Sequence, residues 1–327
     1  MHNKNTYFKF ILSVICYGIL CIFVTQFLTY TPETNAGDKS VIVIQGQDIE
    51  AYNQVVKGFK EGCKRNGITI DKIYNLKGYP DEGKEIVSNS AKKEALPDLI
   101  FTTGILAASL AKEHFPETPI IFSMVINYER FNLVAPNISG IAAEASIEKQ
   151  FRTLREILSD DLKIGVMYDP NKTGHIVSYA QDYLRNSNRA LIAEKVLSPD
   201  EVPHAFENLK KKQMNALWLL PDSTIITHES LNTIFNLARE NNIPVFCTSD
   251  ALVKYGALFS VSADYFSAGL QAAEMADTII KDPTGSSAGI VYPDNVKITV
   301  NKKLAEKYGV GIRQLQSRKD VKWYLDN

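Results

Sequence analysis

Residues 243–280 read IPVFCTSDALVKYGALFSVSADYFSAGLQAAEMADTII, and their pattern is the most informative in the chain. A buried strand is predicted at Pro244–Phe246, followed by the polar residues Cys247–Asp250 and by a second strand at Ala257–Val261. A long helix with small residues on one side follows, starting after Asp264. Polar residues at the carboxyl ends of strands bind ligands in parallel α/β sheets. The stretch therefore predicts an α/β protein whose chain passes between two lobes that enclose a ligand cleft.

Outward from this stretch, β-rich runs alternate with amphipathic runs along the chain. Strands are predicted at 41–44, 68–74, 98–102, 120–124, 164–168, 190–196 and 216–220, and helices at 51–66, 81–94, 105–114, 146–158, 176–187, 199–213 and 227–241. Strands that alternate with helices of this length imply parallel sheets with right-handed crossovers. Since 327 residues exceed what one hydrophobic core usually organises, we expect two similar lobes of the doubly wound type.

Three short segments are predicted to pass between the lobes: Ser139–Ala142, Leu258–Ser262 and Lys297–Val300. A chain that crosses three times makes each lobe discontinuous and leaves a hinge of several strands between them. The predicted N-terminal lobe comprises residues 40–141 and 259–291, and the C-terminal lobe comprises residues 142–258 and 292–327.

Residues 1–36 differ in character from the rest. Two lysines precede the apolar run Phe10–Leu28, and Thr34 and Ala36 supply the small residues of a cleavage site. This order is typical of a secretory signal peptide, but the apolar run is also long enough to span a bilayer if it is retained. Both interpretations stay open. In either case we expect the rest of the chain in the periplasm or at the outer face of the cytoplasmic membrane, touching the membrane only through this segment.

The composition excludes several classes of function. A formal net charge of -1 without a basic stripe argues against a nucleic-acid partner. The five histidines show no metal-ligand spacing, and no nucleophile elbow or phosphate loop is present, so we expect no metal, no cofactor and no catalysis. A hydrolase or isomerase centred on His175 is the remaining enzymatic alternative. Cys63 and Cys247 are expected as free thiols in different lobes.

Ligand-binding residues are expected at the carboxyl ends of strands and at the amino ends of the helices that follow them. The candidates are Gln47, Asp48, Thr103, Gly104, Ser123, Tyr168, Asp222, Ser223, Thr224, Asp250 and Asp264. Thr103 and Gly104 open a helix whose free amides suit a carboxylate, and Asp222 suits a ligand ammonium. The alternative is that Thr103, Asp222 and Asp264 cap helices and that Asp250 caps a loop.

Aromatic residues near these positions are candidates for a wall against an apolar ligand side chain. They are Tyr52, Phe101, Tyr128, Tyr168 and Tyr265. The alternative is that most of them belong to the hydrophobic core.

A series of motifs in a fixed order covers the chain from Val41 to Ile312. They are Ile141–Gln150, Ile164–Pro170, Pro221–Ser223, Asp250, Lys254–Ala257, Asp264–Tyr265, Gly269 and Val300–Lys303. In this order and spacing the chain resembles the substrate-binding proteins of ABC importers with the type I periplasmic-binding-protein fold, in the branch that contains tryptophan-binding proteins. The chain departs from that family's usual pattern at Gly174-His175 and at Gln45–Asp48.

The resemblance implies a receptor that closes its two lobes on a small molecule and docks to the permease of an ABC importer. An amino acid, aromatic or branched, is the expected ligand, although the two departures allow another. The alternative is a ligand sensor that the N-terminal segment anchors in the membrane, with a signalling protein as its partner.

Overall fold

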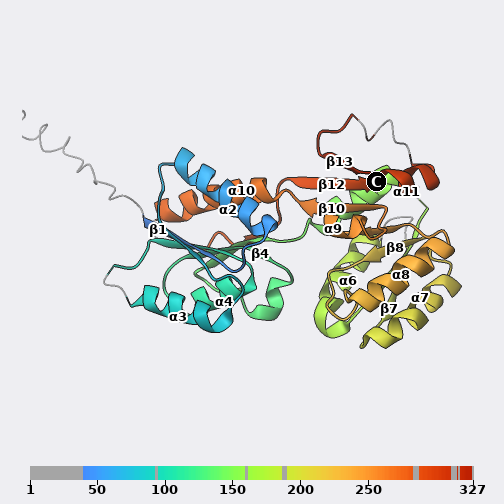
Figure 1. Cartoon of the computed structure of the whole chain (residues 1–327), viewed down its shortest axis with the longest axis horizontal. Coiled ribbons are helices and arrows are strands. Elements are labelled where there is room, and N and C mark those ends of the chain that lie inside the picture. The colour runs from blue at the N-terminus through green and yellow to red at the C-terminus, as the bar shows by residue number, and fades with distance from the viewer. Residues whose placement is uncertain are drawn as a thin grey trace, which may run out of the picture. The chain divides into compact units, whose positions relative to one another are not determined.

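Two α/β lobes make up the part of the chain that the computed structural model describes (Figure 1), namely residues 40–92, 95–158, 161–185, 190–282, 287–310, 315 and 317–325. All of these residues fall in one compact unit. The predicted signal peptide or anchor, residues 1–36, lies outside the described residues. Among the described helices none has the length and apolar character needed to cross a membrane.

The N-terminal lobe is built on a six-stranded sheet in the order β11-β5-β4-β3-β1-β2, in which every pair is parallel. Its strands are β1 (Ser40–Gln45), β2 (Thr69–Asn75), β3 (Leu99–Thr103), β4 (Ile120–Val125), β5 (Ile138–Ala142) and β11 (Ile290–Val291). Its helices are α2 (Glu50–Arg65), α3 (Pro80–Ala91), α4 (Ile105–His114), η1 (Tyr128–Phe131) and α10 (Tyr265–Lys281). Because the central strands are apolar on both faces, helices must cover both.

Alternate residues of β1 divide between those two helical layers. Val41 and Val43 pack in the core beneath α2 and α10, whereas Ile42 and Ile44 pack in the core above α3 and α4 (Figure 1). The strand thus carries no polar face, which explains its unbroken apolar run.

Helices α2 and α10 meet backbone to backbone through two glycines. A Cβ atom at Gly269 would lie 2.1 Å from the carbonyl oxygen of Val55, and one at Gly58 would lie 2.0 Å from that of Phe266. No side chain fits such an approach. The small residues of the predicted long helix therefore bind it to the first helix of the lobe, about two hundred positions earlier in the sequence.

The C-terminal lobe is built on a seven-stranded sheet in the order β13-β12-β10-β9-β8-β6-β7, parallel except for the β10–β12 pair. Its strands are β6 (Lys163–Tyr168), β7 (Ala190–Lys195), β8 (Ala216–Leu219), β9 (Val245–Cys247), β10 (Phe259–Ala263), β12 (Val296–Asn301) and β13 (Val321–Tyr324). Its helices are α5 (Ile147–Ile157), α6 (Pro170–Leu184), η2 (Pro199–Glu201), α7 (Val202–Lys211), α8 (His228–Glu240), α9 (Asp250–Val253) and α11 (Lys302–Lys307). The fold class predicted from the sequence, two largely parallel α/β sheets, is confirmed.

The chain passes between the sheets at residues 143–146, at Asp264 and at residues 292–295. These crossings lie side by side, because Glu144 forms a β-bridge with Ser262 and the Asp264 amide donates a hydrogen bond of 3.0 Å to the Asn295 carbonyl. The connection between the lobes is therefore a single bundle of adjacent segments.

The segments predicted to cross differ slightly from those that do. Ser139–Ala142, Leu258–Ser262 and Lys297–Val300 lie within or at the ends of β5, β10 and β12, and the chain crosses just after the first two and just before the third. The second piece of the N-terminal lobe was predicted to begin at residue 259. In the structure Phe259–Ala263 pairs with β9 and β12 in the other sheet, so that piece begins at Asp264.

Cys63 and Cys247 are free and buried, one in each lobe, as predicted. Burial raises the pKa of both thiols to about 12. Neither is a reactive thiolate at neutral pH.

Candidate functional site

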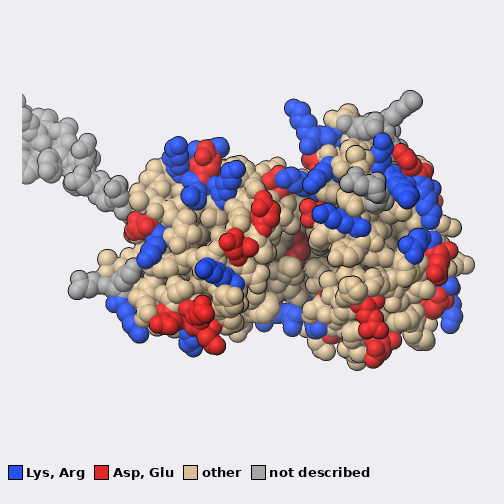
Figure 2. Space-filling model, viewed as in Figure 1, with Lys and Arg blue, Asp and Glu red and all other residues tan. Residues whose placement is uncertain are grey.

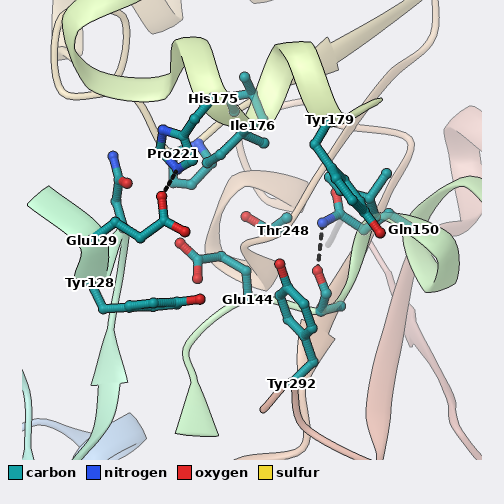
Figure 3. A pocket seen from close by; sticks show the side chains of 14 residues that line it. Tyr128, Glu129, Glu144, Gln150, His175, Ile176, Tyr179, Pro221, Thr248 and Tyr292 are labelled. Atoms are coloured by element: carbon teal, nitrogen blue, oxygen red, sulfur yellow. Dashed lines mark hydrogen bonds and ion pairs between the residues drawn. The ribbon is translucent and has the colours of Figure 1, made fainter. Parts of the chain in front are cut away.

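A cavity of about 390 Å³ lies between the two lobes, beside the crossings (Figure 3). Its volume falls in the range of small-molecule sites. The surface is hollowed between the two halves, and acidic side chains show inside the hollow (Figure 2). The lining consists of Asn127, Tyr128, Glu129, Glu144, Ala145, Ile147, Gln150, His175, Ile176, Tyr179, Leu220, Pro221, Thr248 and Tyr292.

Helix α6 supplies one wall of the cavity. Asp169 caps its first turn by accepting a 2.9 Å hydrogen bond from the Asn171 amide, and a proline occupies the first helical position. With the start of the helix fixed in this way, His175 and Tyr179 project from adjacent turns of one face into the cavity (Figure 3).

The opposite wall comes from the segment after β4. Asn127 has a left-handed backbone (φ 55°), which asparagine tolerates well, and turns the chain into η1. Its side-chain amide donates a hydrogen bond to the Lys172 carbonyl of α6. This contact joins the two lobes across the cavity and places Tyr128 and Glu129 opposite His175.

Two carboxyl groups, from Glu129 and Glu144, enter the cavity from the N-terminal lobe and the first crossing (Figure 3). Atom Oε1 of Glu144 is buried and has no hydrogen-bond partner. Burial raises the pKa of Glu144 to about 7, although the backbone amides of Glu144 and Asn127 act in the opposite direction. Atom Oε2 of Glu129 lies 3.5 Å from Nε2 of His175, and the two form an ion pair when the imidazole is protonated. A buried carboxyl oxygen without a partner is costly unless a bound group supplies the missing donor.

Tyr128, Tyr179 and Tyr292 line the cavity with aromatic rings that carry hydroxyl groups, and those of Tyr128 and Tyr292 point into it (Figure 3). Burial is the main cause that raises the pKa of Tyr292 to about 12, so its hydroxyl stays protonated and can donate. Tyr179 donates to Oε1 of Glu148 at 2.5 Å. The site can therefore hold an apolar or aromatic body beside a polar end.

The raised pKa of Glu144 predicts a dependence of stability on pH. Between the ordinary carboxyl pKa and pH 7, the folded chain keeps a proton that the unfolded chain has lost, so this residue makes stability fall as the pH rises. Glu144→Gln should remove that slope. We expect the melting temperature of the variant, relative to the unmodified protein, to increase from pH 5 to pH 7. A constant difference across this window would contradict the assignment.

Asp222 was predicted to pair with a ligand ammonium, but its carboxylate is hydrogen-bonded by residues of its own lobe. It is fully buried, and its carboxylate accepts hydrogen bonds from the Asp169 amide (2.8 Å), the Thr173 hydroxyl (2.5 Å) and the Thr224 amide (2.9 Å). It does not line the cavity. Asp222 therefore stabilises the local turns, and the helix cap that the alternative assigned to it is instead made for α8 by Thr227.

Thr224 belongs to the same network. Its hydroxyl donates to Asp169 Oδ2 at 2.8 Å and accepts from Lys172 Nζ at 2.6 Å. Burial acts to raise the pKa of Asp169, but the Asn171 amide, the Thr224 hydroxyl and Lys172 together hold it below its usual range.

The predicted residues of the N-terminal lobe stand at the carboxyl edge of its sheet. Gln47 and Asp48 are exposed, and Asp48 accepts a 2.9 Å hydrogen bond from Asn53. Thr103 and Ser123 are paired across β3 and β4, and both hydroxyls are buried without a partner. These residues do not line the cavity in this structure.

Gly104 follows Thr103 with a left-handed φ of 83°, and a Cβ atom there would strike the Tyr52 ring. This explains why glycine stands at that position, which also lies outside the cavity.

The other predicted residues also lie outside the cavity. Tyr168 packs against the core of the C-terminal lobe, Ser223 is exposed, and Asp250 begins α9. Asp264 caps α10 by accepting a 3.0 Å hydrogen bond from Ser267, as the alternative interpretation holds, and lies 3.6 Å from Lys297.

Among the aromatic candidates only Tyr128 lines the cavity. Phe101, for example, is core, stacked on Phe59 with ring centroids 3.9 Å apart. His175, the centre of the enzymatic alternative, does line it. The described residues contain no cluster of three or more His, Cys, Asp or Glu side chains suited to a metal ion.

Glu144 lines the cavity but is not among the residues predicted from the sequence. It stands in Ile141-Ala142-Ala143-Glu144-Ala145, a single charge within an apolar run directly after a strand. A lone carboxylate in such a run is the signal that could have identified it.

The chain is similar to known proteins over most of its length. The family model described as ABC transporter substrate binding protein matches residues 40–319. The chain is similar to the tyrosine-binding protein of Clostridioides difficile, with 23% identity over 317 residues and coverage of 90% of each chain.

Two solved structures are similar in fold. One is the ligand-free, open structure of a substrate-binding protein with adhesive properties from Clostridium difficile, with a TM-score of 0.73, 22% identity and coverage of 88% of this chain and 100% of that chain. The other is an ABC domain in complex with L-Trp from Streptococcus pneumonia, with a TM-score of 0.61, 18% identity and coverage of 87% and 100%.

Proposed function

The chain belongs to the family of ABC transporter substrate-binding proteins, because the family match spans residues 40–319, and we propose that it captures an amino acid or a closely related amine between its lobes. Members of this family bind substrates and do not catalyse a reaction, so an enzyme centred on His175 is not the function of this chain. The observation that carries the proposal is atom Oε1 of Glu144, a buried carboxyl oxygen of a cavity-lining residue that has no hydrogen-bond partner.

An ammonium group would complete the hydrogen bonding of Glu144. Such a charge-assisted bond is short and strong, and it gives the buried carboxylate the donor it lacks. The tyrosine rings around it suit an apolar or aromatic body, and the cavity volume of about 390 Å³ is large enough for one amino acid. The names of two similar proteins, a tyrosine-binding protein and an L-Trp complex, support the same class of ligand.

Closure of the lobes would supply contacts from the N-terminal sheet. The segment after β4 lines the cavity, and β3 ends at the same edge of this parallel sheet. Thr103 and Ser123, whose buried hydroxyls have no partner, are therefore our proposed additional contacts in a closed state. The adjacent crossings at 143–146, Asp264 and 292–295 are the proposed hinge.

We propose that the protein lies outside the cytoplasm and that its binding partner is the permease of an ABC importer. The alternative, a sensor anchored by residues 1–36, differs in the fate of that segment. Mass spectrometry of the exported protein separates the two: a mature protein that starts near Gly37 supports a released receptor, and a full-length chain supports the anchored sensor.

Thermal melting tests the proposed function. We expect at least one amino acid or its decarboxylated amine to raise the melting temperature, since a ligand at a hundred times its Kd stabilises the native state by about 2.7 kcal/mol. Sugars provide a control panel of similar size without an ammonium. If only sugars raise the melting temperature, or if no compound does, the proposed ligand class is wrong.

A further inference from the structure

The described lining of the cavity contains acidic side chains and no lysine or arginine. Two carboxyl groups, Glu129 and Glu144, line it, and none of the fourteen described lining residues is a lysine or an arginine. His175 is the one lining side chain that can become cationic, and it already lies 3.5 Å from Glu129. The lining therefore offers a carboxylate ligand no free positive charge.

Two lysines on helices that line the cavity are engaged elsewhere. Lys149 of α5 donates to the carbonyls of Pro293 (2.6 Å) and Asp294 (2.8 Å). Lys172 of α6 donates to the Thr224 hydroxyl at 2.6 Å. To reach a ligand carboxylate, either would have to give up contacts that hold the crossing or the α6 turn in place.

Each side-chain amide of the lining already donates one hydrogen bond within the protein. The Gln150 amide donates to the Ala145 carbonyl at 2.7 Å, and its oxygen accepts a 3.0 Å hydrogen bond from the Trp218 indole. The Asn127 amide donates to the Lys172 carbonyl. The donors left for a ligand carboxylate are neutral: the second N–H of each amide and hydroxyls such as those of Tyr128 and Thr248. That carboxylate would also stand close to two like charges.

We propose that this site prefers a cationic amine to the zwitterionic amino acid with the same side chain. The inference rests on the proposed function, since it names the charge class of the same ligand. The ammonium is held by Glu144, the tyrosines enclose the apolar body, and an α-carboxylate adds repulsion without a compensating ion pair.

Matched pairs of ligands test the preference. Isothermal titration at about pH 8 compares tyrosine with tyramine, tryptophan with tryptamine, phenylalanine with phenethylamine and leucine with 3-methylbutylamine. We expect the tightest ligand to be an amine that binds at least about tenfold more tightly than its amino acid, because a full charge repulsion is removed. 3-(4-Hydroxyphenyl)propionate, which keeps the carboxylate and lacks the ammonium, should not bind.

The outcomes separate this inference from the proposed function. If an amino acid binds as tightly as its amine or more tightly, the inference is overturned and the proposed function stands. If no amine binds but an amino acid raises the melting temperature, the inference again fails alone. If neither class has any effect, both fail.

A pair of variants tests the role of Glu144 itself. Glu144→Gln should weaken binding of the preferred amine by about tenfold or more, because it removes a charge-assisted hydrogen bond. Glu274→Gln, an exposed position on α10 outside the cavity, is the matched control and should leave the affinity unchanged. Equal affinities for the amine in Glu144→Gln and in the unmodified protein would overturn the assignment.

Discussion

Gly269→Ala is expected to lower the free energy of unfolding by about 3 kcal/mol, through overpacking of the contact between α2 and α10. The new Cβ atom would lie 2.1 Å from the Val55 carbonyl oxygen and 2.7 Å from the Phe59 amide nitrogen. Both are backbone atoms of a helix, so no rotamer change can make room, and the helices must separate. Urea denaturation followed by circular dichroism measures the loss.

A second glycine provides the control. Gly174 lies within α6, and a Cβ atom there would meet nothing closer than 3.8 Å. Gly174→Ala should therefore raise stability by about 0.5–1 kcal/mol, since alanine favours the helix and restricts the unfolded chain. If Gly269→Ala costs no more than Gly174→Ala, the close helix contact does not exist as described.

The contact between Gly269 and Gly58 shows how much of the fold could be predicted from the sequence. The alternation of strands and helices follows from short-range periodicity, so the two parallel sheets could be predicted from residue spacing. The small residues on the helix after Asp264 were visible in the same way. Nothing in the spacing shows that they pack against Gly58, because that contact joins two segments separated by most of the chain.

The lobe boundary predicted at residue 259 differs from the one in the structure for a related reason. Phe259–Ala263 is an apolar strand that would fit either sheet, and its pairing with β9 and β12 depends on which neighbours are available in three dimensions. A local pattern predicts that such a strand exists. It does not predict which sheet receives it.

The cavity lies at sheet edges where ligand contacts were predicted, but none of the predicted ligand-binding residues lines it in this structure. Pro221 and Thr248 line the cavity, one and two residues before the predicted Asp222 and Asp250. The strand-end rule locates an edge, and the geometry of each turn then decides which side chain faces the ligand. Glu144 also follows a strand, two residues after the end of β5, but it was not among the predicted residues.

Asp222→Ala is expected to lower the free energy of unfolding by about 3 kcal/mol and to leave ligand affinity unchanged in the folded protein. The substitution removes the acceptor of three hydrogen bonds, from the amides of Asp169 and Thr224 and from the Thr173 hydroxyl. Those donors lie in a region from which water is excluded, since Asp222 is fully buried, and each pays a desolvation cost once its acceptor is gone.

The neighbouring exposed residue gives the control for this prediction. Ser223→Ala should change stability by no more than about 0.5 kcal/mol, because Ser223 is exposed and neither hydrogen-bonds to the network nor lines the cavity. Urea denaturation and titration with the preferred amine or amino acid measure the two effects of Asp222→Ala separately. If Asp222→Ala leaves stability unchanged and weakens binding by about tenfold or more, Asp222 contacts the ligand. Loss of a purely structural carboxylate would lower the stability of the protein as well.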